Sequence, residues 1–136
     1  FSQWADVVVL ASPMYCWSVT AQEKAVLDRL FYAASARLRF KPAAAVASAR
    51  RAGTTSTWDQ INKYFGILEM PIVTSQYWNQ VHGRTPDEVR QDTEGMQTMR
   101  TLARNMAYML RCKEAAKKAG VPLPKREPVI LTDFIH

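Results

Sequence analysis

Three short stretches of this sequence carry residue types that suit the binding of a planar ligand. The first offers Ser12, Tyr15, Trp17 and Ser18, the second offers Arg50, Arg51 and Gly53, and the third offers Trp78 and His82. Aromatic rings can stack on a flat group, hydroxyls can bond to its polar rim, and guanidinium groups can neutralise its negative charge. An isoalloxazine ring is a ligand of this kind. We therefore expect a flavin at the first two stretches and the substrate near Trp78 and His82.

Several of these residues also have a purely structural interpretation. Tyr15 and Trp17 could cap the core above a strand, and His82 could be a hydrogen-bonded structural histidine. The two arginines suit plain solvent exposure as well as contact with a flavin or a cosubstrate. Cys16 has no adjacent base, so a packing role is expected for it rather than that of a nucleophile.

Each stretch follows a run of residues that predicts a β-strand, at residues 6–11, 43–48 and 72–76. The first run shows no alternation of polar and apolar residues, which is typical of a strand buried on both faces in a parallel sheet. The carboxyl ends of parallel strands meet at one edge of a sheet, where ligands bind in α/β proteins. The three stretches are therefore expected to line one crevice.

Helices are predicted between and after these strands. Thr20 and Glu23 form a capping-box pattern ahead of a helix that extends to about Leu38, and further helices are expected at residues 57–68 and 93–119. A short helical turn should begin at Thr85. This alternation of strands and helices predicts an α/β fold with a parallel sheet and right-handed crossovers.

The chain divides into an expected domain at residues 1–120 and an extended tail at residues 121–136. Prolines interrupt the tail, and Gly120 is a typical helix stop. The tail also contains apolar residues, Val129, Ile130, Leu131 and Phe134 among them. We expect these side chains to pack on their own domain or on a partner chain.

Composition limits the classes of function. Of 136 residues, 48% are hydrophobic and 22% charged, as in an ordinary globular domain, and no apolar run approaches the roughly 20 residues that span a bilayer. With no signal peptide visible, we expect a cytoplasmic protein and no membrane contact. The net charge of +6 lies mostly at residues 100–126 without interleaved aromatic residues, so we expect no nucleic-acid partner. Cys16 and Cys112 have no metal-site spacing, and no metal is expected.

Longer segments resemble a known family. Residues 12–29, SPMYCWSVTAQEKAVLDR, are similar to the SP-x-Y…K-x-x-x-DR stretch of the NADPH-dependent FMN reductase family, which includes the iron–sulfur flavoproteins. Residues 77–110 resemble that family's C-terminal half, and the closing LTDFIH resembles its final residues. The resemblance covers nearly all of the chain.

The resemblance implies a flavodoxin-like three-layer α/β/α fold that holds FMN at the carboxyl edge of the sheet. One side of the flavin would be lined by Ser12, Pro13, Met14, Tyr15, Cys16, Trp17 and the adjoining Ser18. The ring's carbonyl edge would meet Ser48, Ala49, Arg50, Arg51 and Gly53, where an arginine would favour the reduced anionic flavin. The implied reaction is hydride transfer from NAD(P)H to FMN and then to a small-molecule or protein electron acceptor. A homo-oligomer, dimer or tetramer, is expected.

The sequence also departs from the family pattern. The family's first strand, its phosphate-binding loop and its second strand have no counterpart in these residues, so residues 7–11 should form an open sheet edge. The cysteine cluster of the iron–sulfur branch is also absent, and no cluster is expected. The alternative is a flavodoxin-like binding or assembly module without cofactor competence.

Overall fold

The computed structural model describes residues 5–134, which form a three-stranded parallel sheet with helices on both faces. The strands are β1 (Val8–Pro13), β2 (Ala43–Ala49) and β3 (Gln80–His82), in the spatial order β1-β2-β3. Val8 lies opposite Ala43 and Ala47 lies opposite Gln80, so the carboxyl ends of the strands meet at one edge. The structure confirms the expected flavodoxin-like α/β class.

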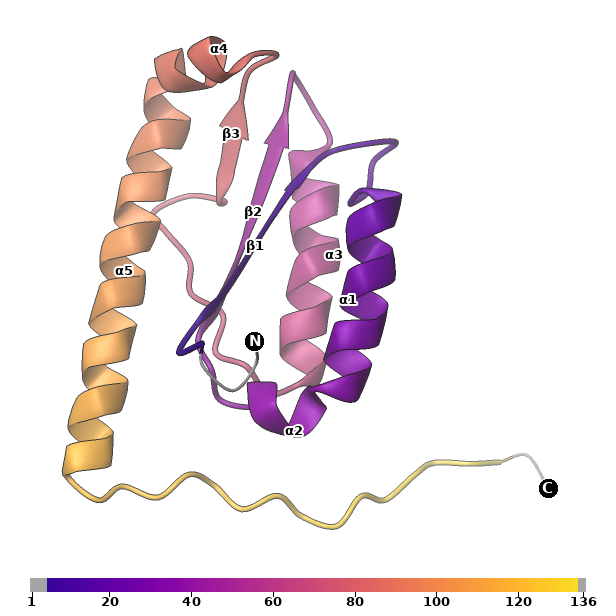
Figure 1. Ribbon diagram of the computed structural model, residues 1–136, viewed down its shortest axis with the longest axis vertical. Helices are drawn as coiled ribbons and strands as arrows, with labels where there is room; N and C mark the ends of the chain where they lie inside the picture. Colours follow the sequence, from indigo (N-terminus) through magenta and orange to yellow (C-terminus); the bar gives the residue numbers. More distant parts are fainter. Residues whose placement is uncertain (1–4, 135–136) are drawn as a thin grey trace.

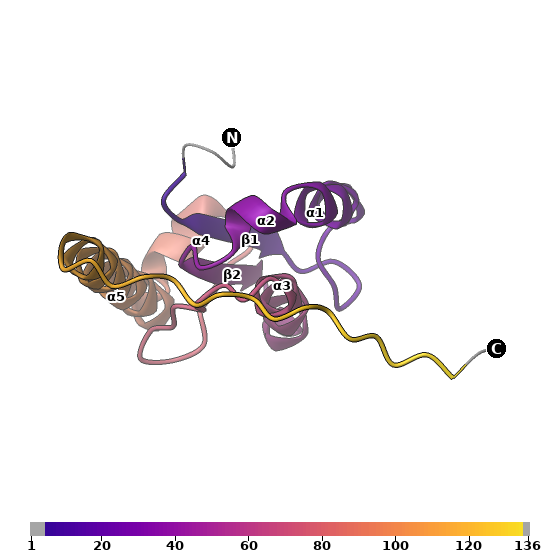
Figure 2. The same cartoon turned by 90° about the horizontal axis from the view of Figure 1, so that it is seen from below.

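The helices form two outer layers (Figures 1 and 2). Helices α1 (Ala21–Ala33) and α3 (Thr54–Ile67) cover one face of the sheet, and α5 (Thr93–Lys118) covers the other. Two short helices, α2 (Ser35–Leu38) and α4 (Pro86–Gln91), lie at the turns. The helix expected to reach Leu38 is therefore divided at Ala34, where the backbone leaves helical geometry.

Side-chain caps fix where three of the helices begin. The Thr20 hydroxyl accepts a hydrogen bond from the backbone N–H of Glu23 at 3.1 Å, and the Thr85 hydroxyl accepts one from Glu88 at 3.3 Å. The Asp92 carboxylate accepts one from the backbone N–H of Gly95 at 2.9 Å. These bonds satisfy amide groups that have no partner within a helix, and they set where the loops before α1, α4 and α5 end.

The core has two halves, one on each face of the sheet. Leu27, Phe31, Ile61 and Phe65 fill the space below α1 and α3, and burial of each such side chain contributes about 1.5–3 kcal/mol. On the other face, Leu102 and Met106 of α5 pack with Val73. Four alanines of β2 lie between these halves with no exposed surface, Ala43, Ala44, Ala45 and Ala47, so the helices can approach the sheet closely.

The third strand lies later in the chain than residues 72–76, so that prediction is wrong. Ile72 makes only an isolated bridge to Ala43, and β3 begins at Gln80. Between them, the Ser75 hydroxyl donates hydrogen bonds to the Tyr77 carbonyl and to the Asn79 side chain, which hold an irregular excursion. The chain returns where Ala47 N–H donates to the Asn79 carbonyl at 3.0 Å. The loop at the sheet edge is consequently the one that follows His82.

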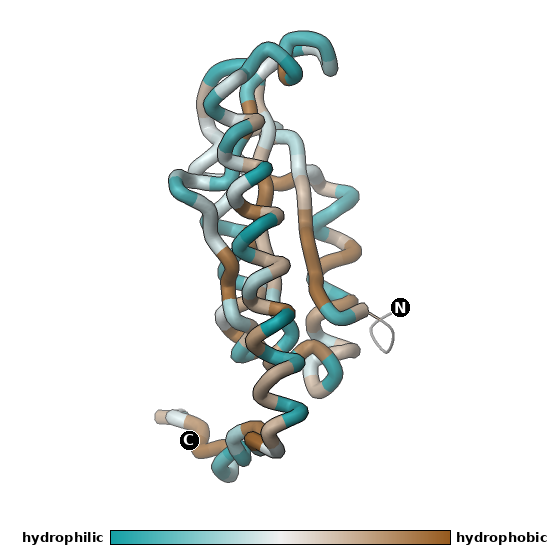
Figure 3. The backbone as a smooth tube through the Cα atoms, turned by 90° about the vertical axis from the view of Figure 1, so that its left-hand side faces the viewer, coloured by the Kyte–Doolittle hydropathy of each residue, from teal (hydrophilic) through white to brown (hydrophobic). Residues whose placement is uncertain are grey.

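β1 forms one margin of the sheet, and its apolar course is visible in Figure 3. Its residues alternate between partly buried and exposed until Ser12, and 53% of the Val9 side chain is exposed. The expected burial on both faces is therefore wrong within the described residues. The expected open edge is confirmed, because β1 pairs in the described part of the chain with β2 alone.

After Gly120, residues 121–134 form no helix or strand and run beneath the domain (Figure 2). Their apolar side chains are exposed, so the expected packing on the chain's own domain is not seen in the residues that the structure describes. No helix among those residues is both long and apolar enough to cross a membrane.

Candidate functional site

The loops that follow β1, β2 and β3 surround a crevice of about 590 Å³ at the carboxyl edge of the sheet. Eight of the residues expected from the sequence line it. They are Pro13, Met14, Tyr15, Trp17, Ser48, Ala49, Arg50 and Arg51. The structure therefore brings the first two predicted stretches together, and a volume of this size accommodates a cofactor-sized ligand.

The first loop presents its aromatic rings from a tight turn. Tyr15 and Ser18 exchange two backbone hydrogen bonds of 3.0 Å, and both intervening residues have positive φ angles, 49° at Cys16 and 65° at Trp17. Positive φ at both central positions is the pattern of a type I′ turn, which usually contains Asn or Gly. The side chains of Tyr15 and Trp17 are 62% and 65% exposed. The turn thus holds two aromatic rings away from the core at a cost in backbone strain.

Neighbouring elements fix this turn in place. Met14 N–H donates to the Ser48 carbonyl at 2.7 Å, which ties the loop to the end of β2. The Ser56 hydroxyl donates to the Trp17 carbonyl at 2.6 Å, which ties it to α3. The buried Ser12 hydroxyl accepts from Thr20 N–H at 3.2 Å and lies outside the crevice lining. Ser12 therefore supports the loop from below.

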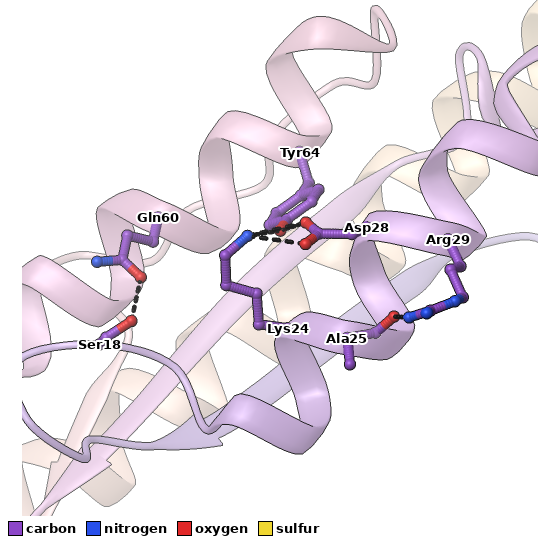
Figure 4. A network of polar contacts seen from close by, with 7 residues as sticks. All are labelled: Ser18, Lys24, Ala25, Asp28, Arg29, Gln60 and Tyr64. Atoms are coloured by element: carbon purple, nitrogen blue, oxygen red, sulfur yellow. Dashed lines mark hydrogen bonds and ion pairs between the residues drawn. The ribbon is translucent and has the colours of Figure 1, made fainter.

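Two further members of the first stretch face elsewhere. Ser18 donates to the Gln60 side chain of α3 at 2.6 Å, so its hydroxyl lies on the helix side of the loop (Figure 4). The exposed Cys16 lies at the tip of the turn and is outside the crevice lining.

The second loop needs glycine where it enters α3. Gly53 has a φ of 90°, and a Cβ atom there would lie 3.0 Å from the Met14 side chain. Its backbone conformation and this close approach both favour glycine. Gly53 therefore shapes the crevice from behind Met14, without lining it.

Three arginines give the crevice a positive rim. Arg50, Arg51 and the third arginine, Arg84, are exposed, and no carboxylate within residues 5–134 forms an ion pair with them. A cluster of guanidinium groups beside aromatic rings favours an anionic planar ligand or a phosphate group.

The sequence reasoning missed Ala52, Gly83 and Arg84, which also line the crevice. Gly83 and Arg84 follow β3, so they would have been found had the third strand been placed at residues 80–82. The available signal was a glycine and a cation two and three residues after the apolar Val81.

Trp78 and His82 lie in a separate hollow of about 40 Å³ beside α5. The backbone N–H of His82 donates to Asp92 at 2.7 Å, and its Nδ1 atom lies 3.9 Å from the same carboxylate oxygen. The Trp78 ring packs against Tyr77 with centroids 4.8 Å apart. A structural role for His82 and a substrate contact for the pair both stay predictions.

A second polar cluster joins α1 to α3 (Figure 4). Lys24 Nζ lies 2.9 Å from an Asp28 carboxylate oxygen and 3.1 Å from the Tyr64 hydroxyl, which itself donates to Asp28. The hydrogen bond from Tyr64, and then that from Lys24, lowers the pKa of Asp28 below its usual value. The cluster lies in a groove of about 420 Å³ that is separate from the crevice. It ties two helices together on the face away from the sheet.

Within residues 5–134, no group of three or more His, Cys, Asp or Glu side chains is arranged to hold a metal ion.

Comparison with known proteins supports the flavodoxin-like fold and identifies the family. Residues 2–84 match the family described as NADPH-dependent FMN reductase. An iron-sulfur flavoprotein of Methanocaldococcus jannaschii is 31% identical over 115 residues, which are 79% of this chain and 60% of that protein. The chain thus spans less than two thirds of this relative's length.

Two solved structures share the fold at low sequence identity. A flavodoxin, WrbA-like protein from Agrobacterium tumefaciens gives a TM-score of 0.57 at 12% identity, over 85% of this chain and 69% of that one. RosB, determined with bound 8-demethyl-8-formylriboflavin-5'-phosphate, gives a TM-score of 0.62 at 16% identity, over 99% and 64% of the two chains. The match over residues 2–84 covers more than half of the sequence, and the chain belongs to the NADPH-dependent FMN reductase family.

Proposed function

We propose that this chain is the flavin-ring-binding part of an FMN-dependent NAD(P)H oxidoreductase. The observation that carries the proposal is the crevice at the carboxyl edge of the sheet, which is lined by two exposed aromatic residues and three arginines. Family membership supports a flavin-associated oxidoreductase function, and RosB, of similar fold, binds a flavin phosphate derivative.

The residues of the crevice suit FMN in size and chemistry. A volume of about 590 Å³ accommodates a three-ring system, and Tyr15 and Trp17 offer flat faces to stack on it. Arg50 and Arg51 would neutralise charge at the polar edge of the ring, while Arg84 would meet a phosphate or the anionic part of a cosubstrate. The surroundings of Gly53, where a Cβ would press on Met14, keep the second loop close to the first.

Bound FMN supplies hydride acceptance, so this chain's side chains need only bind, orient and exclude water. Trp17 and Tyr15 would shield one face of the ring from solvent, and the positive rim would favour the reduced anionic form. NAD(P)H would approach the open side of the crevice, with Trp78 and His82 as the proposed substrate contacts. The electrons would pass to a small molecule or a protein. We also propose that the protein works in the cytoplasm as a homo-oligomer, without nucleic acid.

A spectroscopic experiment on the full protein tests the proposal. We expect the purified protein to show flavin absorbance, or to gain it on titration with FMN, and we expect NAD(P)H to bleach that absorbance without oxygen. A colourless protein whose fluorescence FMN cannot change would contradict flavin binding and leave the alternative of a binding or assembly module. A yellow protein that NAD(P)H does not bleach would contradict the hydride step alone.

A further inference from the structure

Residues 121–134, here called the arm, expose an unusual amount of apolar surface. Val129, Ile130 and Leu131 are 68%, 93% and 81% exposed, and Phe134 is 86% exposed. Large side chains gathered in one extended segment mark an interaction surface, because water contact with them is unfavourable. The arm is therefore a segment that needs a receiving surface.

The base of the arm is fastened to its own domain. Arg39 donates to the Pro124 carbonyl at 3.2 Å, and Arg126 lies 3.2 Å from a carboxylate oxygen of Glu69. Glu69 also binds Arg39 at 2.6 Å, so one carboxylate joins α2, the end of α3 and the arm. Beyond this anchor, the arm leaves the domain on the side of α1 and α3 (Figures 1 and 2).

Prolines keep the arm from folding back. Pro122, Pro124 and Pro128 each fix their own φ angle and restrict the preceding residue to extended conformations. The arm up to Pro128 is therefore semi-rigid and extended, and this part loses little entropy when the arm binds. Its seven residues from 128 to 134 span about 23 Å when extended. The apolar end thus reaches well beyond the anchor.

A matching groove lies between α1 and α3. It holds about 420 Å³ and is lined by Ser18, Val19, Lys24, Gln60, Lys63, Tyr64 and Ile67. Ile67 is 73% exposed, and Tyr32, one helical turn beyond Asp28, is 90% exposed. The groove combines apolar and aromatic surface from Val19, Tyr64 and Ile67 with polar side chains that can bond to the backbone of an extended segment. The Lys24–Asp28–Tyr64 cluster keeps the two walls of the groove together (Figure 4).

We propose that the arm of one copy seats in the α1–α3 groove of a second copy, and that the exchange is reciprocal. The arm leaves each copy on the side that carries the groove, so a two-fold axis beside α1 and α3 would bring each arm to the other copy's groove. Ile130 and Leu131 contact Ile67 and Tyr64 of the second copy, while Lys63 and Gln60 donate to carbonyl groups of the extended arm. The proposal does not depend on flavin binding.

Disulfide crosslinking between two differently labelled copies tests this arrangement in the full protein. In a background with Cys16→Ser and Cys112→Ser, Ile130→Cys is co-expressed with Ile67→Cys, and the two chains carry different tags. We expect an oxidised dimer that contains both tags. As a matched control, Tyr108→Cys on α5, also exposed, replaces Ile67→Cys and should give at least tenfold less mixed dimer.

A second measurement uses sedimentation of the same protein. Ile130→Asp and Ile67→Asp should each lower the molecular mass of the assembly, whereas Tyr108→Asp should leave it unchanged. The proposal would be overturned if the wild type is a monomer, or if the arm variant Ile130→Asp keeps the wild-type mass. It would also be overturned if Tyr108→Cys gives as much mixed dimer as Ile67→Cys. A chain that carries both Ile67→Cys and Ile130→Cys gives a further check. If its disulfide forms only within one copy, the proposal is also overturned.

Discussion

Single residues at the crevice combine exposure with strained geometry. Trp17 has a positive φ angle that bulky side chains rarely adopt, and its ring is nevertheless 65% exposed. Left-handed geometry at a non-glycine residue costs about 1–2 kcal/mol. The burial of its ring does not offset this cost. A bound planar ligand would cover the ring, and this links the strain to binding.

We predict that Trp17→Ala weakens FMN binding by roughly 5- to 150-fold, since stacking of a flat base on an aromatic side chain contributes about 1–3 kcal/mol. Quenching of FMN fluorescence during titration measures the affinity. Tyr108→Ala removes an exposed ring on α5 and should leave it unchanged. Equal affinities for Trp17→Ala and the wild type, with an unchanged circular dichroism spectrum, would refute a stacking role.

Two glycines at opposite ends of α3 provide a matched pair. Gly53→Ala places a Cβ atom 3.0 Å from the Met14 side chain at a φ of 90°, so we predict a loss of about 1–2 kcal/mol in the free energy of unfolding. Gly66→Ala lies inside α3 with no heavy atom within 4 Å and should instead raise stability by about 0.5–1 kcal/mol. Urea unfolding measures both, and the same sign for the two variants would contradict this account.

At the scale of elements, the clearest tie between helices is the Lys24–Asp28–Tyr64 cluster. The pKa of Asp28 lies below its usual value, first because of the hydrogen bond from Tyr64 and then because of Lys24. A lowered carboxyl pKa stabilises the fold above the unfolded-state pKa, and this contribution disappears as the pH falls through the lower folded-state pKa. Hydrogen bonds to Asp28 and Tyr64 raise the pKa of Lys24. The resulting stabilisation of the fold is present below pH 10.5, the ordinary pKa of lysine, and is lost as the pH rises through the higher folded-state pKa.

We therefore predict a pH-dependent effect for Tyr64→Phe. The variant should have a lower free energy of unfolding than the wild type near pH 7, and the difference should shrink as the pH falls below 3.8, the ordinary pKa of Asp28. Urea unfolding at several pH values measures it. Tyr32→Phe, an exposed tyrosine on α1, is the control and should match the wild type throughout. A constant difference across this pH range would show that Asp28 is not the group involved.

Local sequence signals predicted most elements because those elements depend on local chemistry. Thr20, Thr85 and Gly120 act on their own helix ends, so their identity suffices to place those ends. β3 depends instead on where residues 74–79 leave and rejoin β2, which hydrogen bonds of Ser75 and Asn79 decide in three dimensions. The sequence therefore predicted Tyr15, Trp17, Arg50 and Arg51 at the crevice, because these residues follow strands that were placed correctly. It did not predict Arg84, which follows β3. The orientation of the Ser18 hydroxyl toward α3 could not be predicted either, because it depends on a contact with Gln60, 42 residues away.

At the scale of the whole molecule, the edge of β1 is exposed, because in residues 5–134 this strand pairs with β2 alone. An edge strand with free backbone groups and apolar side chains can pair with another chain. We predict that Val9→Lys slows the aggregation of the 136-residue chain, because a charge on an edge strand opposes such pairing.

Light scattering during mild heating measures this effect. Val26→Lys on α1 is the control, since Val26 is similarly exposed at 61% but lies outside the sheet. Equal aggregation rates for the two variants would show that the edge of β1 is not the surface responsible.

The alanines of β2 have a consequence for how this protein can vary. Ala43, Ala44, Ala45 and Ala47 have no exposed surface and lie between helices on both faces, so a larger side chain at any of them would push a helix away from the sheet. The central strand therefore tolerates little substitution, whereas Arg50, Arg51 and Ala52, which follow it, are exposed. Descendants of one ancestor could thus acquire new ligand preferences by exchanging loop residues alone, while the strand beneath them stays under purifying selection.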